Sequence, residues 1–207
     1  MAERADGRPR RDRGSAAERR LHFQAATLYL YLEDLKNFRA VRDAALAMDE
    51  TADSVDPANI ATPALLMADP QVDLPRAVAL AEMPPPPWAQ NRTDKWTRVS
   101  RALAAYRTER YDEAIALALE GRGVEALGKP YEAQMFLIES MARAQSGERE
   151  EAREALHRAR PLLDKRFERE DPEFGGGWHN WLTGAILMRE AEAVVGGAGK
   201  ISNPISK

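Results

Sequence analysis

Residues 102–114 read ALAAYRTERYDEA, and this stretch decides the fold. Alanine, leucine and arginine favour helices, and small residues such as Ala102 and Ala114 let two crossing helices approach closely. The pattern returns 38 residues later, with Ser140 in the place of Ala102 and Ala152 in the place of Ala114. Because the offset is the same on both helices, the sequence predicts two successive helical hairpins.

Apolar side chains spaced by three or four residues predict further helices on both sides of this stretch. Sparse β-branched residues argue against strands. The fold expected is all-α, a short stack of tetratricopeptide-like helical hairpins with a C-terminal capping helix. The predicted helices span about 15–32, 35–48, 57–68, 73–81, 93–109, 111–120, 131–146, 148–164 and 178–195.

Composition divides the chain into five segments. Four consecutive prolines, Pro84 to Pro87, predict an extended connection that serves as a rigid spacer or as a ligand for a proline-binding domain. Pro63 should kink or shorten the third helix. The predicted segments are 1–14, a disordered basic leader; 15–83, a degenerate helical-hairpin region; 84–90, the proline-rich connection; 91–196, the repeats with their capping helix; and 197–207, a flexible tail.

Residue usage excludes several kinds of chemistry. The 207 residues include no cysteine, which excludes disulfides, thiolate metal sites and cysteine nucleophiles and fits a reducing compartment. No histidine lies three or four residues from another, and no run of about 18 apolar residues is present. We therefore expect a cytoplasmic protein with no metal, no cofactor, no membrane contact and no enzymatic activity, although spacing alone leaves a Ser/His/Asp arrangement open.

The hairpins resemble tetratricopeptide repeats, which are helix–turn–helix units of about 34 residues. The resemblance is carried by Ala102, by the segment 111–115 and, in the next repeat, by Ser140, Gly147 and Ala152. The sequence departs from the family in three respects: Arg98 stands at the early tryptophan position, Glu109 stands at the turn glycine, and the period is four residues longer.

A second resemblance covers most of residues 21–195. Segments 28–32, 80–82 and 187–193 are similar to the C-terminal helical-repeat region of planctomycete-type bacterial serine/threonine kinases and WD40-propeller proteins. The kinase motifs themselves, a glycine-rich loop, His-Arg-Asp and Asp-Phe-Gly, are absent from this chain. The resemblance implies an accessory, kinase-associated role in bacterial signalling.

The tetratricopeptide resemblance also implies a concave groove that holds a protein or peptide segment. Two alternatives follow: the groove is an open contact face, or the last helix fills it with Trp178 and Trp181. Tyr, Trp and Arg dominate the contact energy of many interfaces. The implied groove residues are Trp96, Val99, Leu103, Tyr106, Arg107, Gln134, Leu137, Met141 and Gln145.

Three functions are compatible with the sequence. A non-catalytic protein-interaction module explains the repeats, and a purely structural spacer explains them as well. Weak nucleic-acid contact is the third, because residues 1–20 hold seven arginines against four acids. The net charge of -3 and the lack of aromatic residues in that segment argue against nucleic acid as the main partner.

Overall fold

The computed structural model describes residues 16–48, 57–84, 94–122, 128–167 and 177–197. These residues form helices joined by turns and contain no strand, which confirms the all-α prediction. The predicted leader 1–14 lies outside the described residues, as do the proline connection from residue 85 on and the tail from residue 198 on. The helices are α1 (Ala16–Tyr31), α2 (Leu35–Leu46), α3 (Ala58–Leu65), α4 (Leu74–Glu82), α5 (Asp94–Arg107), α6 (Tyr111–Arg122), α7 (Lys129–Gln145), α8 (Arg149–Phe167) and α9 (Trp178–Val195).

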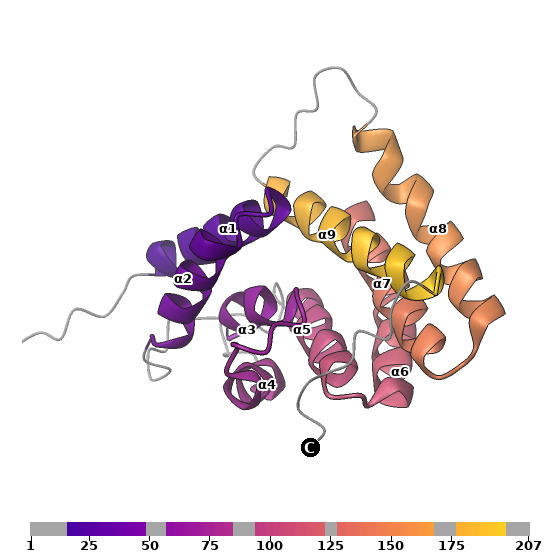
Figure 1. Ribbon diagram of the computed structural model, residues 1–207, viewed down its shortest axis with the longest axis horizontal. Helices are drawn as coiled ribbons and strands as arrows, with labels where there is room; N and C mark the ends of the chain where they lie inside the picture. Colours follow the sequence, from indigo (N-terminus) through magenta and orange to yellow (C-terminus); the bar gives the residue numbers. More distant parts are fainter. Residues whose placement is uncertain (1–15, 49–56, 85–93, 123–127, 168–176, 198–207) are drawn as a thin grey trace, which may run out of the picture.

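The helices form two layers around a common centre (Figure 1). The inner layer is a closed ring, because α1 contacts α3, α3 contacts α5, α5 contacts α7, α7 contacts α9, and α9 returns to α1. The second helices of the hairpins, α2, α4, α6 and α8, lie outside this ring. One hydrophobic core runs from Ala26 to Ala191 and includes residues on both sides of the predicted proline connection.

Three hairpins share one turn geometry. Glu33, Glu109 and Gly147 follow the inner helix with positive φ values of 61°, 61° and 88°. In each turn the next N–H donates to the carbonyl five residues earlier, over 2.9 Å in all three cases. This is a helix C-terminal motif that places a left-handed residue at the end of the helix. Because Glu33 precedes Glu109 by twice 38 residues, the hairpin α1–α2 is in register with the two predicted repeats.

The 38-residue period also fixes the packing of the inner helices. One small residue per inner helix is buried at equal intervals: Ala26, Ala64, Ala102 and Ser140. The Ser140 hydroxyl donates to the carbonyl of Ala152 over 2.7 Å, so the predicted close crossing of the second hairpin is confirmed. The period therefore extends through four hairpins, two more than the sequence comparison of α5–α6 with α7–α8 detected.

The hairpin α3–α4 is the least regular. α3 has only eight residues and contains Pro63, as expected for a helix shortened by proline. The connection to α4 is stabilised by the buried Asp69 carboxylate, which accepts from Arg39 over 2.8 Å and from Arg42 over 2.5 Å. Burial alone would raise the pKa of Asp69, but the hydrogen bonds from the two arginines lower it to about 2. Asp69 therefore remains charged and holds the connection against α2.

Candidate protein-interaction site

The residues predicted to line the concave groove lie inside the closed ring. Val99, Leu103, Gln134, Leu137 and Met141 are at most 1% exposed. Tyr106 and Arg107 are each 7% exposed, and Gln145 is half-buried. The side chain of Trp96 lies outside those that the structure describes. The structure thus brings these residues together, but it covers them with other parts of the same chain.

Arg107 joins three elements at the end of α5. Its Nε donates to the carbonyl of Leu65 over 2.7 Å, and its Nη2 donates to that of Leu66 over 2.9 Å. Nη1 and Nη2 donate to the two carboxylate oxygens of Glu190 on α9, which makes a bidentate ion pair. Burial would lower the pKa of Arg107, but the charge and hydrogen bonds of Glu190 outweigh it and raise the pKa. Arg107 is therefore a charged structural residue that ties α9 and the end of α3 to α5.

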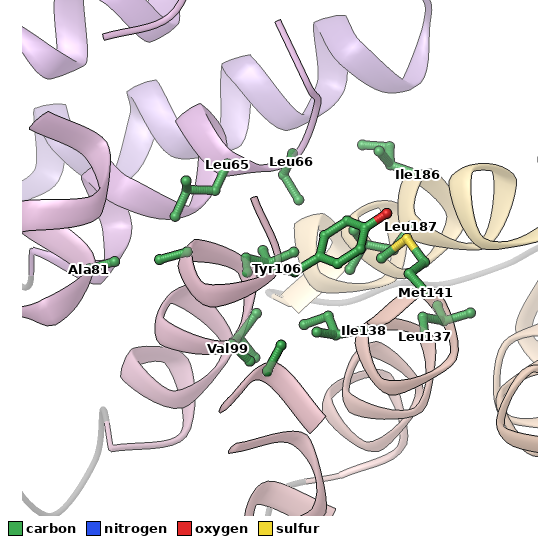
Figure 2. Close-up of a cluster of buried hydrophobic side chains, with 14 of the residues drawn as sticks. Leu65, Leu66, Ala81, Val99, Tyr106, Leu137, Ile138, Met141, Ile186 and Leu187 are labelled. Carbon is green, nitrogen blue, oxygen red and sulfur yellow. The ribbon is translucent and has the colours of Figure 1, made fainter. Parts of the chain in front are cut away.

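Tyr106 lies between α5 and α9 in the ring. Its ring points toward Met141 and Leu187 in Figure 2, with Leu66 nearby. Burial first, and then the charge of Glu190, raise the pKa of the Tyr106 hydroxyl above its usual value. Tyr106 is thus a core residue of the ring in this structure.

α9 closes the ring and covers the predicted groove, mainly with aliphatic side chains. Leu182, Ile186 and Leu187 are buried, and the Gln134 amide donates to the backbone carbonyl of Asn180 over 2.8 Å. Trp181 packs partly against the core, whereas Trp178 lies at the start of the helix in an edge contact with His179. Of the two alternatives, the described residues therefore have the filled groove. The protein-binding role of the groove residues stays a prediction that would require α9 to move away.

The apolar surface that remains open lies on α1. Among the residues that the structure describes, five large apolar side chains are exposed, and four of them belong to α1, to its turn into α2 or to the first position of α2. Three of these side chains form a stripe together with the partly exposed Ala25, at spacings of four, three and four residues. We call this stripe the open face of α1; its residues are Leu21, Ala25, Leu28 and Leu32. The other two are Leu35, which begins α2, and Leu119 on α6.

The 38-residue register shows what this face does in the other hairpins. Met135 on α7 is equivalent to Leu21, and its side chain packs against Gly121 of the preceding outer helix α6. On α5 and α7, the residues equivalent to Ala25 are Arg101 and Glu139. Arg101 on α5 donates to the carbonyl of Glu82 at the end of α4, and Glu139 on α7 pairs with Arg122 of α6. The open face of α1 therefore corresponds to the face that α5 and α7 turn toward the outer helix before them.

A pocket of about 340 Å³ adjoins this surface near the turn from α1 to α2. Its walls are mostly apolar side chains from α1, α2, α9 and the connection after α3, including Leu30, Leu35, Leu66 and Ile186. Arg189 lies at its edge, where it stacks 4.8 Å from the Tyr31 ring and donates to the Tyr31 carbonyl over 3.1 Å. Leu35 thus belongs both to the pocket wall and to the exposed apolar surface.

The contact between α1 and α9 completes the ring. The Phe23 and His179 rings meet edge to face with centroids 5.0 Å apart. Burial first, and then the charge of Arg20, lower the pKa of His179 to about 4. The imidazole is therefore neutral near pH 7 and packs as a largely apolar ring.

The described part of the chain contains no group of three or more His, Asp or Glu side chains placed to hold a metal ion. None of its helices has the length and apolar character needed to cross a membrane. No protein-family model, curated protein or solved structure matches this chain.

The sequence contained a signal for the open face of α1. Leu21, Leu28 and Leu32 already give the first helix an apolar stripe at helical spacing. Extending the 38-residue offset to Ala26 and Ala64 would have shown that this stripe corresponds to the face that α5 and α7 turn toward the hairpin before them.

Proposed function

We propose that this chain is a non-catalytic, cytoplasmic protein-interaction module of the tetratricopeptide-like class, whose contact surface is the open face of α1 with the adjoining pocket. One observation carries the proposal: of the five exposed large apolar side chains in the described residues, four lie on this one surface. Contiguous apolar surface of this kind marks interaction sites in soluble proteins.

The register of the hairpins supports the same conclusion. This face is used for helix packing in α5 and α7, so its side chains are already spaced for contact with a helix. The groove of the inner helices is a weaker candidate, since Arg107 and Glu190 would have to separate before a partner could enter. An accessory role beside a kinase or propeller domain is the setting that the resemblance implies.

Site-specific photo-crosslinking tests this proposal. A photoreactive amino acid would replace Leu28, and in a matched variant it would replace Leu119, which is 40% exposed compared with 39% for Leu28. Each variant would be illuminated in an extract of the native organism, and the products identified by mass spectrometry. We expect a defined polypeptide product from position 28 and none from position 119.

The contrary result has a clear meaning. Equal labelling at the two positions, or no polypeptide product from position 28, would contradict an interaction surface on α1. The chain would then be better described as a structural spacer, the alternative that the repeats also allow.

A further inference from the structure

The inner ring has five helices, but the described residues supply only four outer ones. α3 packs against the outer helix α2, α5 against α4, α7 against α6, and α9 against α8. The inner helix before α1 around the ring is α9, and the described residues place no outer helix between α9 and α1. The open face of α1 is therefore the surface on which a further outer helix would lie.

The spacing of this face fits a helix as its occupant. Apolar residues that alternate in steps of four and three form the seam along which two helices pack. The seam from Leu21 to Leu32 spans twelve residues, about 16 Å at the rise of an α-helix.

We infer that the occupant is α1 of a second copy of this chain, packed antiparallel across a two-fold axis. This inference rests on the proposed function, because it names the partner of the same surface. Antiparallel pairing sets Leu21 of each copy opposite Leu32 of the other, and Ala25 opposite Leu28. Each α1 then takes the place that a further outer helix would have beside the described residues of the other copy, through one self-complementary patch, as in most dimers.

The charges at the two ends of the face select the antiparallel arrangement. Arg20 is exposed just before Leu21, and Glu33, just after Leu32, has an 80% exposed side chain that contacts Arg189 of its own chain only at 3.4 Å. The antiparallel pair brings Arg20 of one copy level with Glu33 of the other at both ends. A parallel pair would instead set Arg20 level with Arg20 and Glu33 level with Glu33, and like charges at an interface disfavour the arrangement.

The position of the remaining apolar surface argues against a head-to-tail contact. Of the exposed large apolar side chains in the described residues, only Leu119 lies away from α1 and the start of α2. Pairing the two α1 faces covers exposed apolar side chains on both copies. If α1 packed against another face of the second copy, exposed apolar side chains would be covered on the first copy only.

Sedimentation velocity of the full chain tests the inference. Over protein concentrations from about 1 to 300 µM, which bracket the dissociation constant expected for a modest interface, the measured mass should rise from 23.1 kDa toward twice that value. Leu28→Glu puts a charge into the seam and should weaken association by at least about 100-fold. The matched Leu119→Glu variant should associate like the wild type. Circular dichroism would confirm that both variants are folded.

A charge exchange tests the orientation. Arg20→Glu or Glu33→Arg alone should weaken the dimer by up to about fivefold, as expected for an exposed ion pair. The double variant Arg20→Glu/Glu33→Arg should recover the wild-type affinity, because each end again has one charge of each sign.

Three results would overturn the inference. A wild-type mass of one chain at every concentration would exclude the dimer, and a dimer that Leu28→Glu leaves intact would use another surface. Association that appears only after residues 198–207 are deleted would identify that segment as the occupant. If the chain is monomeric but position 28 crosslinks to a different polypeptide, the proposed function stands and the second copy is wrong; if position 28 yields no crosslink either, both fail.

Discussion

Two apolar stripes at helical spacing have opposite fates in this molecule. The stripe of Leu103, Tyr106 and Arg107 on α5 has the composition of a contact surface, yet it is buried in the ring. The stripe of Leu21, Leu28 and Leu32 on α1 has the composition of a core, yet it is 39–62% exposed. The comparison teaches that periodicity identifies the apolar face of a helix, whereas the closure of the ring decides which face is covered.

The largest expected effect is on the buried stripe. Arg107→Ala should lower the free energy of unfolding by about 3–5 kcal/mol, because it leaves the Glu190 carboxylate without its partner in the core. Urea unfolding would measure it. The control is Arg160→Ala on α8. It removes the exposed partner of Glu192, which like Glu190 lies on α9, and should lower the free energy of unfolding by less than about 1 kcal/mol. A similar loss for the two variants would mean that α9 does not close the ring as described.

The next largest expected effect on the free energy of unfolding distinguishes a buried from an exposed position on α6. Ala114→Trp should overpack the crossing of α5 and α6 and lower the free energy of unfolding by about 1–3 kcal/mol. Ala116→Trp, on the exposed side of α6, should change it by at most about 0.5 kcal/mol. Equal melting temperatures for these variants would contradict the close crossing.

The contact between α1 and α9 should make stability depend on pH. His179 has a pKa of about 4 when folded and about 6.5 when unfolded, so the unfolded chain binds more protons between these values. Its contribution is complete above pH 6.5 and is lost as the pH falls toward 4, by about 1–2 kcal/mol for a half-buried ring. His179→Gln should flatten this slope relative to the exposed control His157→Gln. Identical slopes would show that His179 is not buried against α1.

The smallest expected effect concerns the shared turns. Glu109 has a φ of 61°, a conformation that glycine adopts without strain. Glu109→Gly should therefore raise the free energy of unfolding by about 0.5–1 kcal/mol. Gly147→Ala, the opposite change at the equivalent turn, should lower it by about 1 kcal/mol. Loss of stability in Glu109→Gly would exclude the common turn geometry.

Much of the fold could be predicted from local signals. The helices follow from apolar spacing and from breakers such as Gly147, and most observed ends lie within a few residues of the predicted ones. α8 contains Pro161 and continues to Phe167, three residues beyond the predicted end at 164. The crossing of Ser140 with Ala152 was also predictable, because small residues at a fixed offset mark it.

The site was harder to predict, because it depends on contacts between residues far apart in the chain. Nothing in the local sequence around Arg107 indicates that Glu190, 83 residues later, would neutralise it in the core. Likewise, nothing around Leu28 indicates that α9 would pack beside α1 with no outer helix of the described residues between them. Closure of the ring is a property of the whole stack, so a single helix carries no signal for it.

The difference in accessibility between the two stripes can be measured directly, because the chain contains no cysteine. Leu28→Cys and Leu103→Cys would each place one thiol, and its reaction rate with a thiol reagent would be compared with that of the unfolded variant at low protein concentration. We predict that the thiol at position 28 reacts within about tenfold of the unfolded rate. The thiol at position 103 should react at least about 100-fold more slowly, since it is reached only when the ring opens. Fast reaction at position 103 with protection at position 28 would contradict the account.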